Sequence, residues 1–408
     1  MVRIADILKL RERQEKSPSK TPDERREKTP LSPSFESEPK SSKENGKVFR
    51  FSVLTETGKP PVSARYESPA SLSPYREGES QGTADEMEGP RRYVAEAIQS
   101  SEANQTANAQ DIYRRAVTLA QGILELAKTG EEIKGQEMHG VIQDIIRGLT
   151  FGNKELLNLA CSETVEASTG FLAAKMANKT ILAVEIGIGK KINKSQLFQL
   201  GMAAFLSDLG VTQVLDVVTK KDVLTPEDWE KIREIPAKTV EILQKIPDLH
   251  QVVLTVAEEF RERSEDTAVQ VQALQKMDPF SRIVALIDVF EALTHDRPYR
   301  ARMMPHEAMR LILHGGGKKF EQETLRLLID RIGLYPIGSW VKLSSKEFAK
   351  VVETNPGQPM RPGVKVLYDE KGRPLEEPVR LDLSKNLSIQ ILQPVAEKEI
   401  QKLTQKNA

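Results

Sequence analysis

The chain has 408 residues, of which 59 are basic and 59 are acidic, and its only cysteine is Cys161. This length suffices for one large domain or a few small ones, and the balanced charge gives no bulk attraction to nucleic acid or to an anionic membrane. A single cysteine excludes an internal disulfide and any cysteine-cluster metal site, as is usual in a reducing cytoplasm. No signal peptide and no run of about 18 apolar residues is found, so we expect a soluble cytoplasmic protein without a membrane span.

Residues 1–90 are rich in Ser, Pro, Glu and Lys. Such a segment cannot bury enough apolar area to offset its chain entropy, so we predict a disordered N-terminal arm. Within residues 1–15, apolar and charged side chains interleave in MVRIADILKLRERQ. This end is either a fraying tail or a docking peptide that folds in a groove of a partner protein, and both interpretations stay open.

Helical spacing of apolar residues begins near residue 91 and continues to about residue 333. We predict a helical lead-in over residues 91–155 and a helical bundle over residues 156–333, with a nearly continuous helical pattern from 156 to 191. Asn193 and Thr225 are expected to be the N-caps of the helices that follow them. The fold class is therefore mainly α.

The pattern changes after Gly333, where strand-sized apolar runs alternate with turn residues. These runs predict a small β subdomain over residues 334–395, followed by a polar tail over 396–408. The expected strands are 339–343, 348–353, 364–368, 379–383 and 387–392.

The stretch from Asp278 to Arg302 organises the helical part, because its apolar residues cover nearly the whole circumference of a helix. A helix that is apolar all round is buried in the centre of a domain. Asp288 lies in the middle of this stretch. A buried carboxylate is costly unless a cation, a metal or hydrogen-bond donors compensate it.

Two motifs, DVFEALTHDRPYR at 288–300 and GLYPIGSWVKLS at 333–344, resemble the C-terminal half of the HD-GYP domain. The resemblance covers residues 111–367. HD-GYP proteins are bacterial metal-dependent phosphodiesterases that typically hydrolyse cyclic di-GMP. The resemblance implies an HD-domain-like bundle with two divalent ions, iron or manganese, and a metal-ligating aspartate at Asp288.

At the other positions that match this family's ligand motifs, the histidines are replaced. Lys175 stands at the histidine of YTxxHSxN, and Ser207 stands at the histidine of HDxGK. Only two aspartates remain of the ligand set, so they are the ligands of any ion that is bound. The positions that match the family's metal site are Lys175, Ser207, Asp208, Ile235, Glu259, Phe260 and Asp288.

The substrate loop of the family, close to RxDGSGYPxGL, matches Arg261 to Asp278, and this segment contains no Gly, Tyr or Pro. Binding of cyclic di-GMP is therefore not expected. His295 and Asp296 also read HD in the sequence, but they do not match the position of the family's metal motif. They are therefore not expected to bind a metal.

These replacements lead to a hypothesis: the Lys175 amine takes the place of the metal and pairs with Asp208 and Asp288. Otherwise Lys175 points to solvent and local donors satisfy the aspartates. We expect a non-catalytic HD-GYP-like signalling or adaptor protein that has no cofactor and binds proteins, through residues 1–15 if the docking interpretation holds, but not nucleic acid. Self-association into a homodimer is left open. The alternatives are a divergent phosphohydrolase with a reduced site at Asp208, Glu259 and Asp288, and a non-hydrolysing cyclic-dinucleotide sensor.

Overall fold

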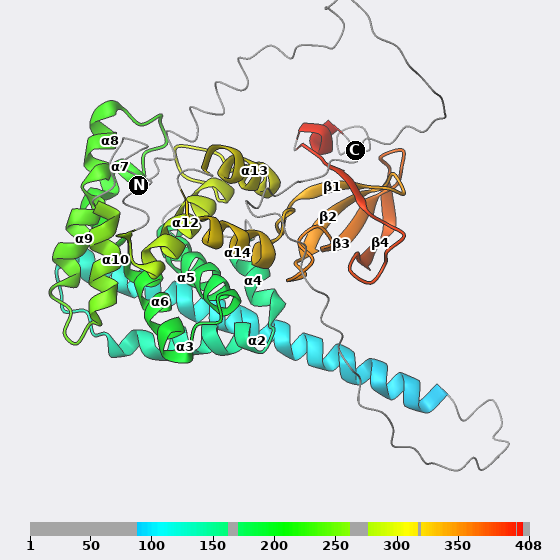
Figure 1. The fold of residues 1–408 in the computed structure, drawn as a ribbon, viewed down its shortest axis with the longest axis horizontal. Helices are drawn as coiled ribbons and strands as arrows, with labels where there is room; N and C mark the ends of the chain where they lie inside the picture. Colours follow the sequence, from blue (N-terminus) through cyan, green and yellow to red (C-terminus); the bar gives the residue numbers. More distant parts are fainter. Residues whose placement is uncertain (1–87, 162–169, 262–275, 317–319, 397, 403–408) are drawn as a thin grey trace, which may run out of the picture. The chain divides into compact units, whose positions relative to one another are not determined.

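A computed structural model (Figure 1) describes residues 88–161, 170–261, 276–316, 320–396 and 398–402. The predicted disordered arm and the docking peptide within it lie almost entirely outside these residues. Residues 162–169, in the middle of the stretch 156–191 that we predicted to be nearly continuously helical, also lie outside the described residues.

The described chain is mainly helical, as predicted, with a small antiparallel sheet at its C-terminal end. The helices are α2 (Glu88–Thr129), α3 (Gln136–Thr150), α4 (Lys154–Cys161), α5 (Phe171–Gly189), α6 (Lys194–Leu206), η2 (Leu209–Val214), α7 (Leu215–Val218), α8 (Pro226–Arg233), α9 (Ile235–Leu243), α10 (Gln251–Arg261), α12 (Pro279–Thr294), α13 (Pro305–Gly316) and α14 (Gln322–Ile332).

Two helices, α5 and α12, are buried on nearly every side and lie in the middle of the helical part (Figure 1). Their apolar side chains belong to one continuous core to which α2 and α3 also contribute, for example through Ile123 and Ile142. The lead-in helices therefore pack on the same core as the rest of the bundle. The predicted central helix is confirmed, and Asp278 caps it by accepting a hydrogen bond of 2.8 Å from the backbone N–H of Phe280.

Both predicted N-caps are confirmed, and each forms a reciprocal capping box. The Asn193 side chain accepts from the backbone N–H of Gln196 at 2.9 Å, and the Gln196 side chain accepts from the N–H of Asn193 at 3.1 Å. Thr225 and Asp228 form the same arrangement at the start of α8. Each box satisfies N–H groups that the first turn of a helix leaves without partners.

The stretch from Lys194 to Val218 is long and apolar enough to cross a membrane by composition alone, and 83% of its most apolar window is buried inside the protein. It spans α6, η2 and α7 rather than one straight helix. Such burial is what a core segment of a globular domain shows.

The C-terminal sheet has five antiparallel strands in the order β4-β3-β2-β1-β5. The strands are β1 (Trp340–Leu343), β2 (Phe348–Glu353), β3 (Gly363–Tyr368), β4 (Pro374–Asp382) and β5 (Ile391–Pro394). The first three agree with the predicted strands to within one residue.

The last two strands and the tail differ from the prediction. β4 already begins at Pro374, and β5 covers 391–394 instead of 387–392. Prolines obscured β4 in the sequence, but β4 is an edge strand, where proline is tolerated. Residues 398–402 are helical, and the buried Ile400 packs with Phe348, so this part is not the polar tail that we predicted.

Candidate functional site

Three helical segments bring together a cluster of buried charges, the Lys–Asp cluster, which we define as Lys175, Lys179, Asp208 and Asp288. The two lysines are one turn apart on α5. Asp208 lies between α6 and η2, and Asp288 lies in the middle of α12. Because these segments form the centre of the bundle, their polar side chains meet one another instead of water.

The lysine amines lie between the two carboxylates. Lys175 Nζ is 2.7 Å from Asp208 Oδ2 and 3.0 Å from Asp288 Oδ1. Lys179 Nζ is 2.5 Å from Asp208 Oδ2 and 3.5 Å from Asp288 Oδ1, and it donates a hydrogen bond of 2.6 Å to Ser207 Oγ. The Lys175 amine therefore has the position that the counter-charge hypothesis requires. The alternative, with Lys175 in solvent, does not fit a side chain that is only 16% exposed.

The opposite charges of Lys175 and Asp208 keep both groups ionised. Burial lowers the pKa of Lys175, but the attraction of Asp208 and then of Asp288 outweighs it and raises that pKa above its usual range. Burial likewise raises the pKa of Asp208, whereas Lys175 and Lys179 together bring it well below its ordinary value. Lys175 and Asp208 are therefore both charged at neutral pH.

A second ion pair lies beside the cluster, between Glu291 on α12 and Arg297 in the loop that follows it. Burial raises the pKa of Glu291, but Arg297 and then His295 outweigh it, so the pKa falls below its usual value. The Arg297 guanidinium also lies 5.6 Å from the centre of the Phe171 ring. With this pair included, three cations (Lys175, Lys179, Arg297) face three anions (Asp208, Asp288, Glu291).

A hydrogen bond ties α2 to the same centre. The Tyr113 hydroxyl donates to Asn178 Oδ1 at 2.9 Å, and Asn178 lies between the two lysines on α5 in sequence. Burial, and next the negative charge of Glu291, raises the pKa of Tyr113, so its hydroxyl stays protonated. The sequence analysis did not identify Tyr113 as part of the site, because a tyrosine at helical apolar spacing is typical of any core face.

Ile235, at the position of a family histidine, is part of an apolar cluster with Phe171 and Val211. Nearby, a Cβ atom on Gly210 would lie 2.2 Å from the carbonyl oxygen of Ile235 and 2.5 Å from the N of Thr239. The glycine that this chain shares with the HDxGK motif is therefore needed for the close approach of η2 and α9. This role is structural and requires no metal.

Glu259 is not near the two aspartates of the cluster. Its carboxylate accepts two hydrogen bonds, of 3.1 and 3.0 Å, from the backbone N–H of Asp278 ahead of α12. Asp278 and Asp288 are ten residues apart along this helix, which corresponds to about 15 Å. The reduced site of Asp208, Glu259 and Asp288, which the alternative of a divergent phosphohydrolase requires, is therefore not assembled.

Phe260 lies near the end of α10, and its side chain falls outside the described part of the structure. The same is true of residues 262–275, which make up most of the segment that matches the family's substrate loop. The match of Phe260 to a metal-site position and the loss of the substrate loop therefore stay predictions.

The arrangement does not fit the metal centre that the resemblance implies. Among the described residues, no group of three or more His, Cys, Asp or Glu side chains could hold a metal ion. The two aspartates already contact two ammonium groups, which cannot ligate a cation while protonated and which repel it. The chemistry of the site is that of a buried salt-bridge network.

Lys179 is the residue of the cluster that the sequence analysis missed. The signal was present, because Lys175 and Lys179 are four residues apart and so lie on one face of a helix that is otherwise mostly apolar. Two lysines at this spacing on a buried helix indicate a shared set of acidic partners.

Comparisons with known proteins agree with this fold. A family model for the HD domain matches residues 155–324, and a model for a KOW domain associated with the HD domain matches residues 340–403. The chain is 24% identical over 251 residues to the cyclic di-GMP phosphodiesterase PA4108 of Pseudomonas aeruginosa, which covers 60% of the chain and 59% of that protein. It is 23% identical over 187 residues to the cyclic di-GMP phosphodiesterase PdeB of Borreliella burgdorferi, which covers 45% of the chain and 49% of that protein.

The matches therefore span about half of one relative and about three fifths of the other. No solved structure is significantly similar to the chain.

Proposed function

We propose that this chain, which belongs to the HD domain family through residues 155–324, keeps the fold of that family without its metal-dependent reaction and acts by binding other proteins. One observation carries the proposal. The amines of Lys175 and Lys179 lie between Asp208 and Asp288, where the family resemblance places a metal ion.

Hydrolysis of a phosphodiester by such a family needs a metal that generates hydroxide from water and neutralises the phosphoryl oxygens. Here a divalent ion would have to displace two buried ammonium groups from their carboxylates. Each displaced amine would then be a buried charge without its partner, which is strongly unfavourable. The site therefore supports no hydrolytic step.

The Lys–Asp cluster accounts for the persistence of the fold. It connects α5, the segment between α6 and η2, and α12. A protein that lost its metal ligands one by one would leave unpaired aspartates in its core, and the two lysines remove that penalty. The bundle then remains a rigid scaffold whose surfaces are free to bind partners.

A cytoplasmic location is part of the proposal. Cys161 is buried, and burial, followed by the nearby charge of Glu185, raises the pKa of its thiol to about 12. A thiol with such a pKa is inert toward oxidation and exchange at neutral pH. This fits a cysteine retained for packing in a reducing compartment.

The loss of the reaction is tested on the purified full-length chain by metal analysis and by a cyclic di-GMP hydrolysis assay with added manganese or iron. We expect no stoichiometric metal and no turnover above the level without protein. Bound iron or manganese together with turnover that Asp208→Ala abolishes would contradict the proposal. Saturable binding of cyclic di-GMP by calorimetry, without turnover, would instead support a nucleotide sensor.

The protein-binding half of the proposal is tested by affinity capture in cells, followed by reconstitution with purified components. We expect at least one partner whose dissociation constant can be measured with the full chain. A chain that lacks residues 1–15 shows whether the N-terminal peptide contributes: a weakened complex supports the docking interpretation, and unchanged affinity assigns binding to the folded part. Failure to find any direct partner would remove the support for an adaptor.

A further inference from the structure

One face of the C-terminal sheet carries a row of basic side chains. In the register of the strands, Lys350 of β2 lies directly opposite Lys365 of β3, and Lys365 lies opposite Arg380 of β4. Residues in this relation point to the same side of a sheet, with their Cβ atoms about 5 Å apart. Three basic side chains therefore project side by side from three adjacent strands (Figure 1), and we call Lys350, Lys365 and Arg380 the basic row. Trp340 of β1 ends the row beside Lys350.

The basic row lies on the solvent side of the sheet. The residues that alternate with it along β2 and β3, such as Val351 and Val364, are buried in the apolar core of the sheet. Lys365 and Arg380 are exposed, and Lys350 is half-buried. The row is therefore accessible to another molecule.

Arg380 has a carboxylate partner, but the two lysines of the row do not. The Arg380 guanidinium donates a hydrogen bond of 2.7 Å to Glu353, whose carboxylate also accepts one from Lys154 of α4. Within the described part of the chain, neither Lys350 nor Lys365 forms an ion pair. Like charges directly opposite each other on neighbouring strands destabilise a sheet. No carboxylate of the described chain offsets this cost for the two lysines.

The other carboxylates of β4 do not compensate the two lysines. Asp382, farther along this strand, accepts a hydrogen bond of 2.6 Å from Ser384 and lies 3.3 Å from Lys385. Glu376 and Glu377 lie where the register between β3 and β4 is interrupted. Neither of them forms an ion pair with the row in the described structure.

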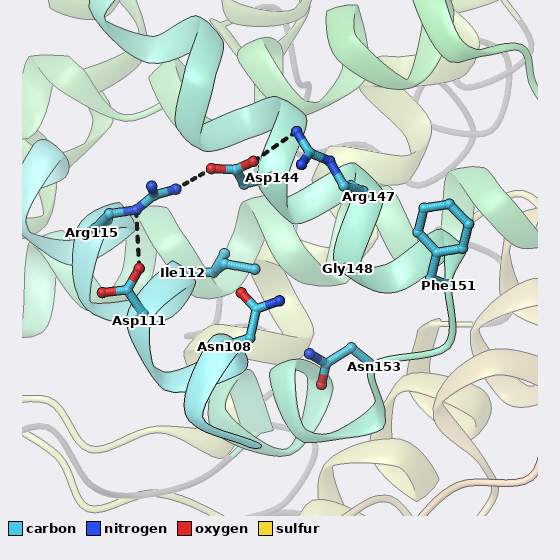
Figure 2. Close-up of a pocket in the computed structure, with 9 residues that line it drawn as sticks. All are labelled: Asn108, Asp111, Ile112, Arg115, Asp144, Arg147, Gly148, Phe151 and Asn153. Atoms are coloured by element: carbon cyan, nitrogen blue, oxygen red, sulfur yellow. Dashed lines mark hydrogen bonds and ion pairs between the residues drawn. The ribbon is translucent and has the colours of Figure 1, made fainter. Parts of the chain in front are cut away.

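The surface pocket between α2 and α3, with a volume of about 200 Å³, shows the opposite arrangement (Figure 2). Its charged side chains already form ion pairs with one another. Arg115 contacts both Asp111 and Asp144, Arg147 contacts Asp144, and the neighbouring Arg114 contacts Asp111. These charges have partners within the chain, so they do not require another molecule to compensate them. The two lysines of the basic row have no such partner.

We propose that the basic row binds an acidic segment of a partner protein, whose carboxylates pair with Lys350 and Lys365. In an extended segment, side chains two residues apart lie on one face at a spacing of about 6.8 Å, and two long lysine side chains reach that spacing from adjacent strands. Trp340 adds an aromatic contact at the end of the row, and aromatic residues are enriched in protein interfaces. The inference rests on the protein-binding half of the proposed function and adds a surface and the chemistry of the partner.

The charges around the row favour a short acidic segment over a nucleic acid. The chain has equal numbers of acidic and basic residues, and Glu353 and Asp382 flank the row. A domain that binds nucleic acid typically has a broad basic surface, with a pI above about 9, and it neutralises many phosphates. Two uncompensated lysines instead match two carboxylates, and no broad positive field is needed for such a contact.

The test is fluorescence anisotropy of a labelled short peptide, in which Glu and Thr alternate, with the full-length chain at about 0.1 M salt. We expect saturable binding, and the same peptide with Gln in place of each Glu should bind at least about tenfold more weakly, because it lacks the charges. Lys365→Glu should also raise the dissociation constant at least about tenfold, since like charges across an interface repel. This variant places opposite charges next to each other in the row, so it should fold and should not lower the free energy of unfolding.

Lys371→Glu is the matched control, because it makes the same change of net charge in the turn between β3 and β4, outside the row. Salt screens this charge from the row, so the dissociation constant should change by less than about twofold. A wild-type chain without saturable binding would overturn the proposal, as would equal weakening by Lys365→Glu and Lys371→Glu. Tighter binding of a single-stranded DNA oligonucleotide, abolished by Lys365→Glu, would assign the row to a nucleic acid and overturn it as well.

The same variant separates this inference from the proposed function. A protein partner that binds the wild-type chain should lose at least about tenfold in affinity for Lys365→Glu. A partner whose affinity this variant leaves unchanged would refute the basic row as the binding surface, while the proposed function would stand. Lack of any direct partner would contradict the proposed function itself.

Discussion

The Lys–Asp cluster and the exposed ion pairs between α2 and α3 contain the same kind of interaction in two different environments. These exposed pairs, which we call the charged rim, join Arg114, Asp111, Arg115, Asp144 and Arg147. In the cluster, Lys179 is fully buried and the side chains of both aspartates are less than a tenth exposed. On the rim, four of the five charged side chains are about half exposed or more. Water screens the rim but not the cluster, so equal distances correspond to very different free energies.

The difference shows what each region can do. A buried pair that loses one partner leaves an uncompensated charge, which costs about 3–5 kcal/mol, whereas an exposed pair contributes about 0–1 kcal/mol. The cluster is therefore suited to hold one arrangement of helices permanently. The rim costs little to rearrange.

The largest effect is expected for Lys179→Met, which removes a buried amine but keeps most of its apolar stem. Asp208 and Asp288 would then share only Lys175, and we expect the free energy of unfolding in urea to fall by about 3–5 kcal/mol. Lys190→Met is the matched control at the C-cap of the same helix. Lys190 pairs with an exposed Glu323, so its loss should change stability by less than about 1 kcal/mol.

A double variant sharpens this result. Lys179→Met combined with Asp208→Asn removes one charge of each sign, so the remaining Lys175 and Asp288 still balance. We expect the loss of stability in the double variant to be smaller than the sum of the two single losses, by an interaction free energy of about 0.5–3 kcal/mol in the double-mutant cycle. Strictly additive losses would mean that Lys179 and Asp208 do not act as a pair.

A change of pH is expected to change the stability of the protein by an intermediate amount. The folded-state pKa of Asp208 is depressed below its unfolded value of about 3.9, so its stabilising contribution is present above that pH and is lost as the pH falls toward the folded pKa. The pKa of Lys175 is raised, so its contribution is present below about pH 10.4 and is lost only at higher pH. Between these limits Asp208 and Lys175 should contribute a constant stability.

Urea denaturation at a series of pH values checks this expectation. Below about pH 4 the wild-type chain should lose stability with a slope that approaches about 1.4 kcal/mol per pH unit for Asp208. Asp208→Asn should reduce this slope, because the amide does not titrate. An unchanged slope in the variant would assign the acid sensitivity to other carboxylates.

The sequence predicted the fold better than the details of the site. Periodicity identified the buried central helix around Asp288, and capping residues located the starts of α6 and α8. These signals are local, so they can be read from one chain. β4 was misplaced because its prolines are compatible with a strand only at a sheet edge, and the sequence does not show which strand lies there.

Within the site, the pairing of Lys175 with two aspartates was a hypothesis that combined the family resemblance, which singled out these positions, with the argument that a buried carboxylate needs a partner. The same argument did not locate Glu259, whose partner is the backbone N–H of Asp278. Because every residue except proline has a backbone N–H, the residue types do not indicate which of these donors a carboxylate binds. The contact between Tyr113 and Asn178 was out of reach for a similar reason, since residues 65 positions apart meet only through tertiary packing.

The smallest effect on stability is expected on the charged rim, where it separates the two regions most clearly. Arg147→Ala removes an exposed ion pair with Asp144 and should lower the free energy of unfolding by less than about 1 kcal/mol. Added salt should reduce this small loss further, because it screens exposed charges. Salt should leave the contribution of Lys179 to stability nearly unchanged, because the cluster is shielded from the ions. If salt reduced both effects equally, the Lys–Asp cluster would be as accessible to solvent as the rim, and its role as a replacement for a metal would lose its physical basis.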